Sequence, residues 1–334
     1  MVKLMWNEMI KHFFRLGTYL CIAFLILIAS LGFIINLFMG VDESMTKSYD
    51  GNNWEQTAKS TIEDYSKDIA KIQEDPKANE DFDKIMELTA KEEEISRLQY
   101  HLDEDIQPAP QMNQYEQIYT NTKSLFTFAV FLIVIITSSM IAVEHHKGTI
   151  KMLLTRPVSR VKIILSKYLT AAVIGFILLA ILYAVVAIWS LITMPGNPTD
   201  LLVVKSPDGY DHANFLAVIG QSFLANLFTI IMISWFTVSF SAIFKSTPLA
   251  LGISFITLYL APLAMMWLSS KIDEKYLKFW LGDNWFIQSY IGGFETPKYD
   301  GMTLTFSIII TLLYIIPLMA IAIYMFRMRD VTSE

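Results

Sequence analysis

The sequence predicts an all-α polytopic membrane protein, on three observations. Apolar and aromatic residues make up 54% of the 334 residues, charged residues only 17%, and the mean hydropathy is +0.43. Soluble domains carry about a quarter charged residues. Six stretches are long and apolar enough to cross a bilayer core about 30 Å thick, which takes roughly 20 helical residues. Cys21 is the one cysteine, which excludes a disulfide framework and a cysteine-based metal site.

The expected spans contain no Asp, Glu, Lys, Arg or His, and they cover residues 18–39, 124–143, 168–194, 215–244, 249–268 and 303–326. The first stretch is too long for the apolar region of a typical signal peptide, so it is predicted to remain as a span. Pro248 is expected to open the fifth span after a tight turn. Pro262 and Pro317 fall inside spans, where kinks are expected.

The distribution of charge predicts the orientation. The connector 144–167 holds six Lys/Arg and one acid, and together with the N-terminal segment, the turn at Lys245 and the tail 327–334 that face carries 12 basic residues. The positive-inside rule makes this face cytoplasmic, with both termini inside. The segments 40–123, 195–214 and 269–302 are then extracellular.

Two flanking segments have helical periodicity. Residues 1–17 interleave aromatic and basic residues around Trp6, which favours a helix lying in the cytoplasmic interface over a plain basic flank. The loop 40–123 has 9 basic and 20 acidic residues, and apolar spacing over 54–75 and 82–102 predicts an extracellular helical hairpin. This hairpin is either an acidic spacer or a lid or partner surface for something cationic, and the sequence leaves both open.

Several functional classes lack their signature residues. The spans contain no ionisable residue, which argues against a proton- or sodium-coupled carrier and an intramembrane protease. The sequence has no HExxH motif, and no phosphate-binding loop of the Walker type, so any ATP-driven step needs another polypeptide. Polar residues in the spans are candidate pathway residues, although helix–helix hydrogen bonding is their commoner role. They are Asn36, Ser138, Ser139, Asn226 and Ser234.

The connector carries the most specific pattern in the chain. A glutamate ends the second span, and Gly-Thr, a Leu-Leu pair and Pro-x-Ser-Arg follow it; the residues are Glu144, Gly148, Thr149, Leu153, Leu154, Pro157, Ser159 and Arg160. This pattern resembles the signature connector of ABC transporter permeases of the type-2 exporter family. The layout is also similar, with an interfacial N-terminal helix, six spans and an aromatic-rich segment before the last span. Ser166 departs from the Gly-Lys that family members often show, and the first outer loop is larger than in many members.

Local signals support a short helix in the connector. Thr149 can cap a helix starting near Ile150, Pro157 stops it, and Ser159 can cap the next helix. Such a helix would insert into a groove of an ATPase subunit and pass its movement to the second and third spans. The alternative is a basic loop with ordinary capping. The candidate coupling residues are Glu144, Gly148, Thr149, Lys151, Leu153, Leu154, Arg156, Pro157, Ser159 and Arg160.

The resemblance implies a non-enzymatic permease subunit in a bacterial plasma membrane. Its partners would be two ATPase subunits, which hold ATP and Mg, and a second permease that is identical or homologous. No nucleic-acid partner is expected. A drug, antimicrobial peptide or other amphipathic molecule is the expected cargo, although sodium export also occurs in this family. The alternative is a membrane sensor or assembly protein that binds an envelope partner through the hairpin. The segment 269–302 is expected to form re-entrant helices or a simple aromatic belt.

Overall fold

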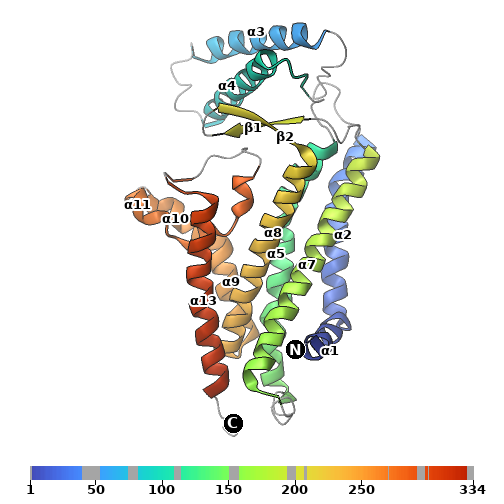
Figure 1. Cartoon of the computed structure of the whole chain (residues 1–334), viewed down its shortest axis with the longest axis vertical. Helices are drawn as coiled ribbons and strands as arrows, with labels where there is room; N and C mark the ends of the chain where they lie inside the picture. Colours follow the sequence, from blue (N-terminus) through green and yellow to red (C-terminus); the bar gives the residue numbers. More distant parts are fainter. Residues whose placement is uncertain are drawn as a thin grey trace.

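The computed structural model describes residues 2–39, 53–73, 82–108, 114–149, 158–193, 201–206, 209–269, 271–291, 298–299 and 301–328. Six of its helical stretches are long and apolar enough to cross a membrane, as the sequence predicts. Figure 1 shows them side by side in one bundle. Val2 and Met328 lie at one end of the bundle, here called the terminal end, and the opposite end is called the hairpin end.

The six stretches that fit a membrane are α2 (Leu16–Met39), α5 (Gln114–His146), α7 (Arg160–Thr193), α8 (Phe215–Phe244), α9 to α10 (Thr247–Phe255 and Ala261–Ser269) and α13 (Leu304–Met328). Helices α5 and α7 are longer than the expected spans 124–143 and 168–194. Both helices continue through charged residues. Such residues end a predicted span, but they do not end a helix that extends beyond a membrane. Residues 160–167 of the expected connector are therefore the first turns of α7.

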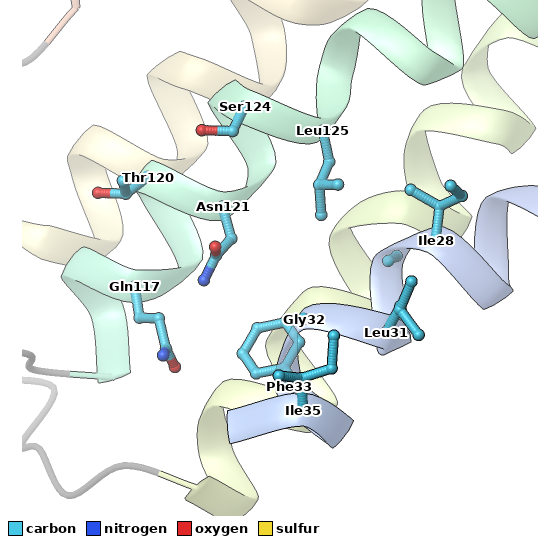
Figure 2. Close-up of a pocket in the computed structure, with 11 residues that line it drawn as sticks. Ile28, Leu31, Gly32, Phe33, Ile35, Gln117, Thr120, Asn121, Ser124 and Leu125 are labelled. Carbon is cyan, nitrogen blue, oxygen red and sulfur yellow. The ribbon is translucent and has the colours of Figure 1, made fainter. Parts of the chain in front are cut away.

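The core lies where α5, α7 and α8 pack against one another. Ile133, Leu179 and Ile233 are fully buried there. A Cβ at Gly175 of α7 would stand 3.3 Å from the side chain of Ile230 in α8, so glycine allows these two helices to approach closely. Helix α2 packs mainly on α7 and leaves a cleft towards α5 (Figure 2). Helix α13 packs on the other side, against α8.

The fifth stretch is irregular, and its sequence explains why. Ser246 caps α9, with Pro248 in its first turn, as expected. A π-helical segment, Ile256–Leu260, separates α9 from α10. Proline lacks an N–H and clashes with the preceding turn, so Pro262 disfavours a regular α-helix through this point.

Within the described ranges, the hairpin end carries one two-stranded sheet, a departure from an all-α fold. Strands β1 (Leu201–Ser206) and β2 (Gly209–Asn214) pair antiparallel within the expected loop 195–214. Helices α3 (Trp54–Gln73) and α4 (Phe82–Asp103) pack on each other through Ala58 and Leu98, and Lys91 bridges Asp68 at 3.2 Å. These pairings run in opposite directions, as in a helical hairpin. The residues between α3 and α4, which include Pro76, lie outside the described residues.

The segment before α13 folds inwards. It contains α11 (Glu274–Leu277), α12 (Leu281–Asn284) and a 3₁₀ turn at Ile287–Tyr290. Trp285 is fully buried, and its carbonyl accepts a hydrogen bond from Thr229 of α8 at 2.7 Å. Ser307 of α13 donates to the Asn284 side chain at 2.8 Å. These contacts hold the segment between α8 and α13. A simple aromatic belt would not need such contacts.

Candidate functional site

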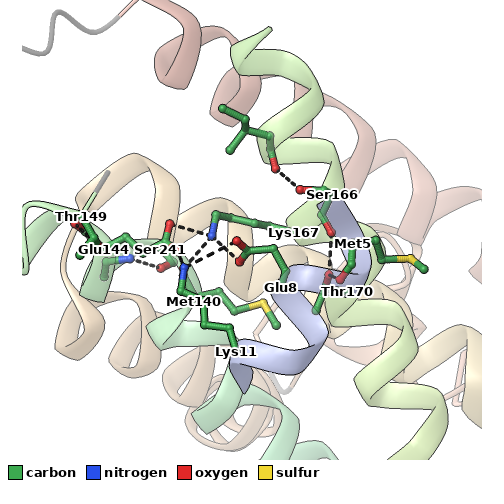
Figure 3. Close-up of polar contacts among 12 residues, drawn as sticks. Met5, Glu8, Lys11, Met140, Glu144, Thr149, Ser166, Lys167, Thr170 and Ser241 are labelled. Carbon is green, nitrogen blue, oxygen red and sulfur yellow. Dashed lines mark hydrogen bonds and ion pairs between the residues drawn. The ribbon is translucent and has the colours of Figure 1, made fainter. Parts of the chain in front are cut away.

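The strongest concentration of buried charge lies at the terminal end, where α1 (Val2–Phe13) meets α5 and α7. Two glutamates and two lysines form it, and we call these four residues, Glu8, Lys11, Glu144 and Lys167, the charge cluster. Figure 3 shows their side chains converging from the three helices. The opposite charges balance, so the cluster is neutral as a whole.

Lys167 is at the centre of the cluster and is fully buried. Its ammonium lies 2.7 Å from a carboxylate oxygen of Glu144 and 2.8 Å from one of Glu8, and it also donates to the carbonyl of Met140 at 3.3 Å. The contacts to Glu8 and Met140 are hydrogen bonds, and the contact to Glu144 is an ion pair. Lys167 therefore joins the end of α5, the start of α7 and α1 in one set of bonds.

Lys11 completes the ion pairs from the side of α1. It bonds to Glu144 and lies 3.6 Å from Glu8, one turn earlier in the same helix. Glu144 is 2% and Glu8 7% exposed. Removing one partner from a buried ion pair costs roughly 3–5 kcal/mol, because a buried charge is left without compensation. The cluster is thus an anchor that fixes α1 to both helices that flank the connector.

His12 lies beside the cluster and is 1% exposed. Burial, with Arg15 and Lys167 nearby, lowers the pKa of its imidazole to about 3, so the ring is neutral in the fold. Burial alone would raise the pKa of the Glu8 carboxyl, but Lys167 and Lys11 outweigh it and hold that pKa below its usual value. Glu8 is consequently an ionised partner for Lys167.

Helix α1 has two different faces. Glu8 and His12 point into the bundle, whereas Trp6, Ile10 and Phe14 beside them are exposed, Phe14 by 79%. The exposed apolar residues match the pattern expected of an interfacial helix. The buried charges do not follow from that pattern.

The sequence explains how α5 ends at the connector. Gly148 has φ +67°, a left-handed conformation that glycine adopts without strain, and its N–H donates to the carbonyl of His145 at 3.1 Å. The Thr149 hydroxyl donates to the carbonyl of Glu144 at 3.4 Å. In the described part of the chain, Gly148 and Thr149 thus hydrogen-bond to the end of α5. The sequence indicates only a role for Thr149 as a cap of the next helix.

The other side of the connector begins at Ser159. The Ser159 carbonyl accepts from the N–H of Ile163 at 3.2 Å, so Ser159 immediately precedes the first turn of α7 as expected. Arg160 donates to the carbonyl of Arg327 at 3.0 Å, which links the start of α7 to the end of α13. The remaining candidate coupling residues, Lys151, Leu153, Leu154, Arg156 and Pro157, lie outside the described residues.

A serine of α8 reaches into the backbone of α5 just before the cluster. The Ser241 hydroxyl donates to the carbonyl of Ser138 at 2.7 Å and accepts from the N–H of Ala142 at 3.1 Å. These two backbone groups are partners in a regular helix, so Ser241 bridges the ladder of α5. It ties α8 to α5 one turn before Glu144.

The candidate pathway residues do not form one shared polar site among the described side chains. Ser138, Ser139 and Ser234 each donate to a carbonyl three residues earlier in their own helix. Asn226 is 1% exposed and donates to the Tyr183 hydroxyl at 3.0 Å, between α8 and α7. Asn36 lies in α2. The four described side chains are thus engaged inside one chain, which favours their role in helix packing.

Sequence reasoning did not find Glu8, Lys11, His12 and Lys167 as site residues. The available signal was that Glu8 and Glu144 are isolated acids within two basic segments. Within the described ranges, no group of three or more His, Cys, Asp or Glu side chains gathers as a metal site. The four charged side chains of the cluster connect three helices.

The fold and this site define a polytopic membrane protein whose terminal end is held together by buried ion pairs. The chain belongs to the family described as "Protein of unknown function (DUF2705)", which matches residues 84–332. It is similar to the "Uncharacterized protein YhcI" of Bacillus subtilis, 26% identical over 337 residues and over the full length of both chains. It is also similar to the "Uncharacterized membrane protein YdbK" of the same organism, 30% identical over 63% of this chain and 80% of that protein.

Proposed function

We propose that the chain is the membrane-spanning permease subunit of an ATP-driven ABC exporter in a bacterial plasma membrane. The observation that carries the proposal is the charge cluster, because it fixes α1 to both helices that flank the connector. A force applied to the connector then reaches α1, α5 and α7 together. This is the mechanical property that a transporter driven by a separate ATPase needs.

The proposal places the terminal end in the cytoplasm and α1 in the membrane interface. Support comes from the 12 basic residues of that face and from the exposed Trp6 and Ile10 of α1 and Phe14 directly after it. Helices α3 and α4 then stand outside the cell. Single cysteines in a Cys21→Ser background test this: a cysteine replacing Ser60, which is exposed on α3, should react with an impermeant reagent in intact cells, and one replacing Lys151 should not. The reverse labelling would overturn the orientation.

The mechanism follows the two-state logic of alternating access. ATP and Mg bind to two copies of a partner ATPase, whose closure moves the connectors of two permease subunits. The path between these subunits then switches from one side of the membrane to the other. Amphipathic cargo, such as a drug or an antimicrobial peptide, fits the uncharged spans better than a bare ion does.

The test is purification of the tagged chain from its host in a mild detergent. We expect a stoichiometric ATPase of the Walker type to co-purify and to be lost when Leu153 and Leu154 are both replaced by Asp. Lys245→Asp, in the α8–α9 turn at the same end, is the matched control and should retain the ATPase. An intact preparation without an ATPase would overturn the proposal. An envelope protein lost on deletion of residues 54–102 would instead support the sensor or assembly role.

A further inference from the structure

A cleft of about 530 Å³ lies between α2 and α5 towards the hairpin end. Its two walls differ in chemistry. The α2 wall is apolar and includes Ile28, Gly32 and Phe33, whereas the α5 wall presents Gln117, Thr120, Asn121 and Ser124. Figure 2 shows Gln117 and Asn121 pointing across towards α2, whereas the hydroxyls of Thr120 and Ser124 point away from it.

The polar wall is a stripe along one side of α5, since its residues are three or four positions apart. This stripe falls within Gln117–His146, the part of α5 that is apolar enough to cross a membrane. Polar groups at membrane depth need a hydrogen-bond partner, because lipid tails offer none. The Oε1 atom of Gln117 is buried and has no partner among the described residues. The cleft therefore offers hydrogen-bonding capacity that the described chain leaves unused.

None of the eleven residues that line the cleft is ionisable. An ionic headgroup would find no counter-charge there and would lose its hydration on entry. A hydroxyl or amide, which both donates and accepts, complements the amide of Asn121 and the carbonyl oxygen of Gln117. The wall chemistry thus selects an uncharged polar head.

A second pocket of about 540 Å³ follows along the same seam, nearer the terminal end. It is lined only by apolar residues and Cys21, with Phe24 and Leu27 on α2 and Phe131 and Leu132 on α5. Leu132 in the second pocket lies seven positions along α5 from Leu125 in the first, about 10 Å of helix. The seam therefore offers a site for a polar head followed by a site for an alkyl chain.

We infer that the α2–α5 seam binds an amphiphile with an uncharged hydroxyl- or amide-bearing head and an alkyl tail, which enters from the leaflet at the hairpin end. The head binds beside Gln117 and Asn121, and the tail runs along Phe24 and Leu132. The further step, that this amphiphile is the substrate class of the exporter, rests on the proposed function. Binding itself needs neither ATP nor a partner, so the two are tested separately.

The experiment uses the purified full chain in nanodiscs without ATP. The probe is a monoacylglycerol with a photoactivatable diazirine in its acyl chain, and labelled residues are mapped by mass spectrometry. We expect labelling to concentrate on residues 20–35 of α2 and 125–132 of α5. A photoactivatable fatty acid of the same length, whose head is a carboxylate, should label these segments at least fivefold less.

Matched glycine variants test the site. A Cβ at Gly32 or at Gly252 of α9 meets no atom within 4 Å, so both positions accept a larger side chain. Gly32→Leu fills the cleft and should reduce labelling of the seam at least fivefold, whereas Gly252→Leu should leave it within twofold. Asn121→Leu, which keeps the volume but removes the amide, should reduce labelling by the glycerol-headed probe and not by the fatty acid.

Three results would overturn the inference. The first is labelling spread evenly over all lipid-facing helices, and the second is seam labelling that Gly32→Leu and Asn121→Leu leave unchanged. The third is a disulfide-linked dimer formed through Thr120→Cys in a Cys21→Ala background, since a second copy would then cover the seam. If no ATPase co-purifies with the wild-type chain but the seam is labelled as expected, the proposed function is overturned and this inference is not.

Discussion

Replacement of Lys167 by methionine is the most direct test of the charge cluster. Methionine keeps much of the length and removes the charge, so Glu8 and Glu144 remain with Lys11 alone. The cluster then carries a net buried negative charge at a place where Glu144 is 2% exposed. We expect the free energy of unfolding to fall by roughly 3–5 kcal/mol, the usual effect of breaking a buried ion pair.

The assay is equilibrium unfolding in mixed micelles of a mild detergent and dodecyl sulfate, followed by tryptophan fluorescence. Lys162→Met is the matched control, since Lys162 lies exposed in the first turn of the same helix. It should change the free energy of unfolding by no more than about 0.5 kcal/mol.

A double-mutant cycle separates charge balance from lost packing. Combining Lys167→Met with Glu8→Gln leaves one lysine and one glutamate, so the cluster is neutral again. We expect the double variant to be more stable than the sum of the two single effects by about 0.5–3 kcal/mol. A Lys167→Met variant within 1 kcal/mol of the wild type, or a coupling energy of zero, would refute the reasoning: α1 would then not be anchored by these charges.

Three further predictions concern the same end of the bundle. His12 is neutral in the fold with a pKa of about 3 against an ordinary 6.5, so its contribution to stability is complete above pH 6.5 and falls as the pH drops towards 3. From pH 7.5 to 5.0 the free energy of unfolding of the wild type should fall by about 2 kcal/mol more than that of His12→Gln. Equal decreases in the two proteins would contradict this. Gly148→Ala should cost about 1–2 kcal/mol because of its φ of +67°, while Gly252→Ala, in helix α9, should not destabilise; a thermal melt in detergent compares them. Ser241→Ala removes both bonds to the α5 backbone and should speed amide hydrogen exchange at Ala142; unchanged exchange would show that the bridge does not hold α5 in place.

The sequence predicts those elements whose ends are set by neighbouring residues. The expected span 215–244 has the same bounds as α8, because Asn214 caps its start and Lys245 ends it in a left-handed conformation. Ser246 and Pro248 likewise define the start of α9. The hairpin β1–β2 was not expected, although Pro207 and Asp208 ahead of Gly209 are typical of a turn between strands.

The candidate site depends on contacts that no local pattern contains. Gly148, Thr149 and Ser159 have local roles at helix ends, and the sequence indicates such roles. Glu8 and Lys167 are 159 residues apart, and only the packing of α1 across α5 and α7 brings them together. A count of basic residues treats every lysine as surface charge, so it does not reveal that Lys167 is buried.

The ion pairs also impose an order on the biosynthesis of the chain. Glu8 and Lys11 are made before their partners, which follow 159 and 133 residues later. At about 5–20 residues per second, the nascent α1 waits roughly 8–30 s before Lys167 is synthesised. During this interval its acid and base have no partners from α5 or α7. Docking of α1 can therefore be completed only after the end of α5 and the start of α7 have been synthesised.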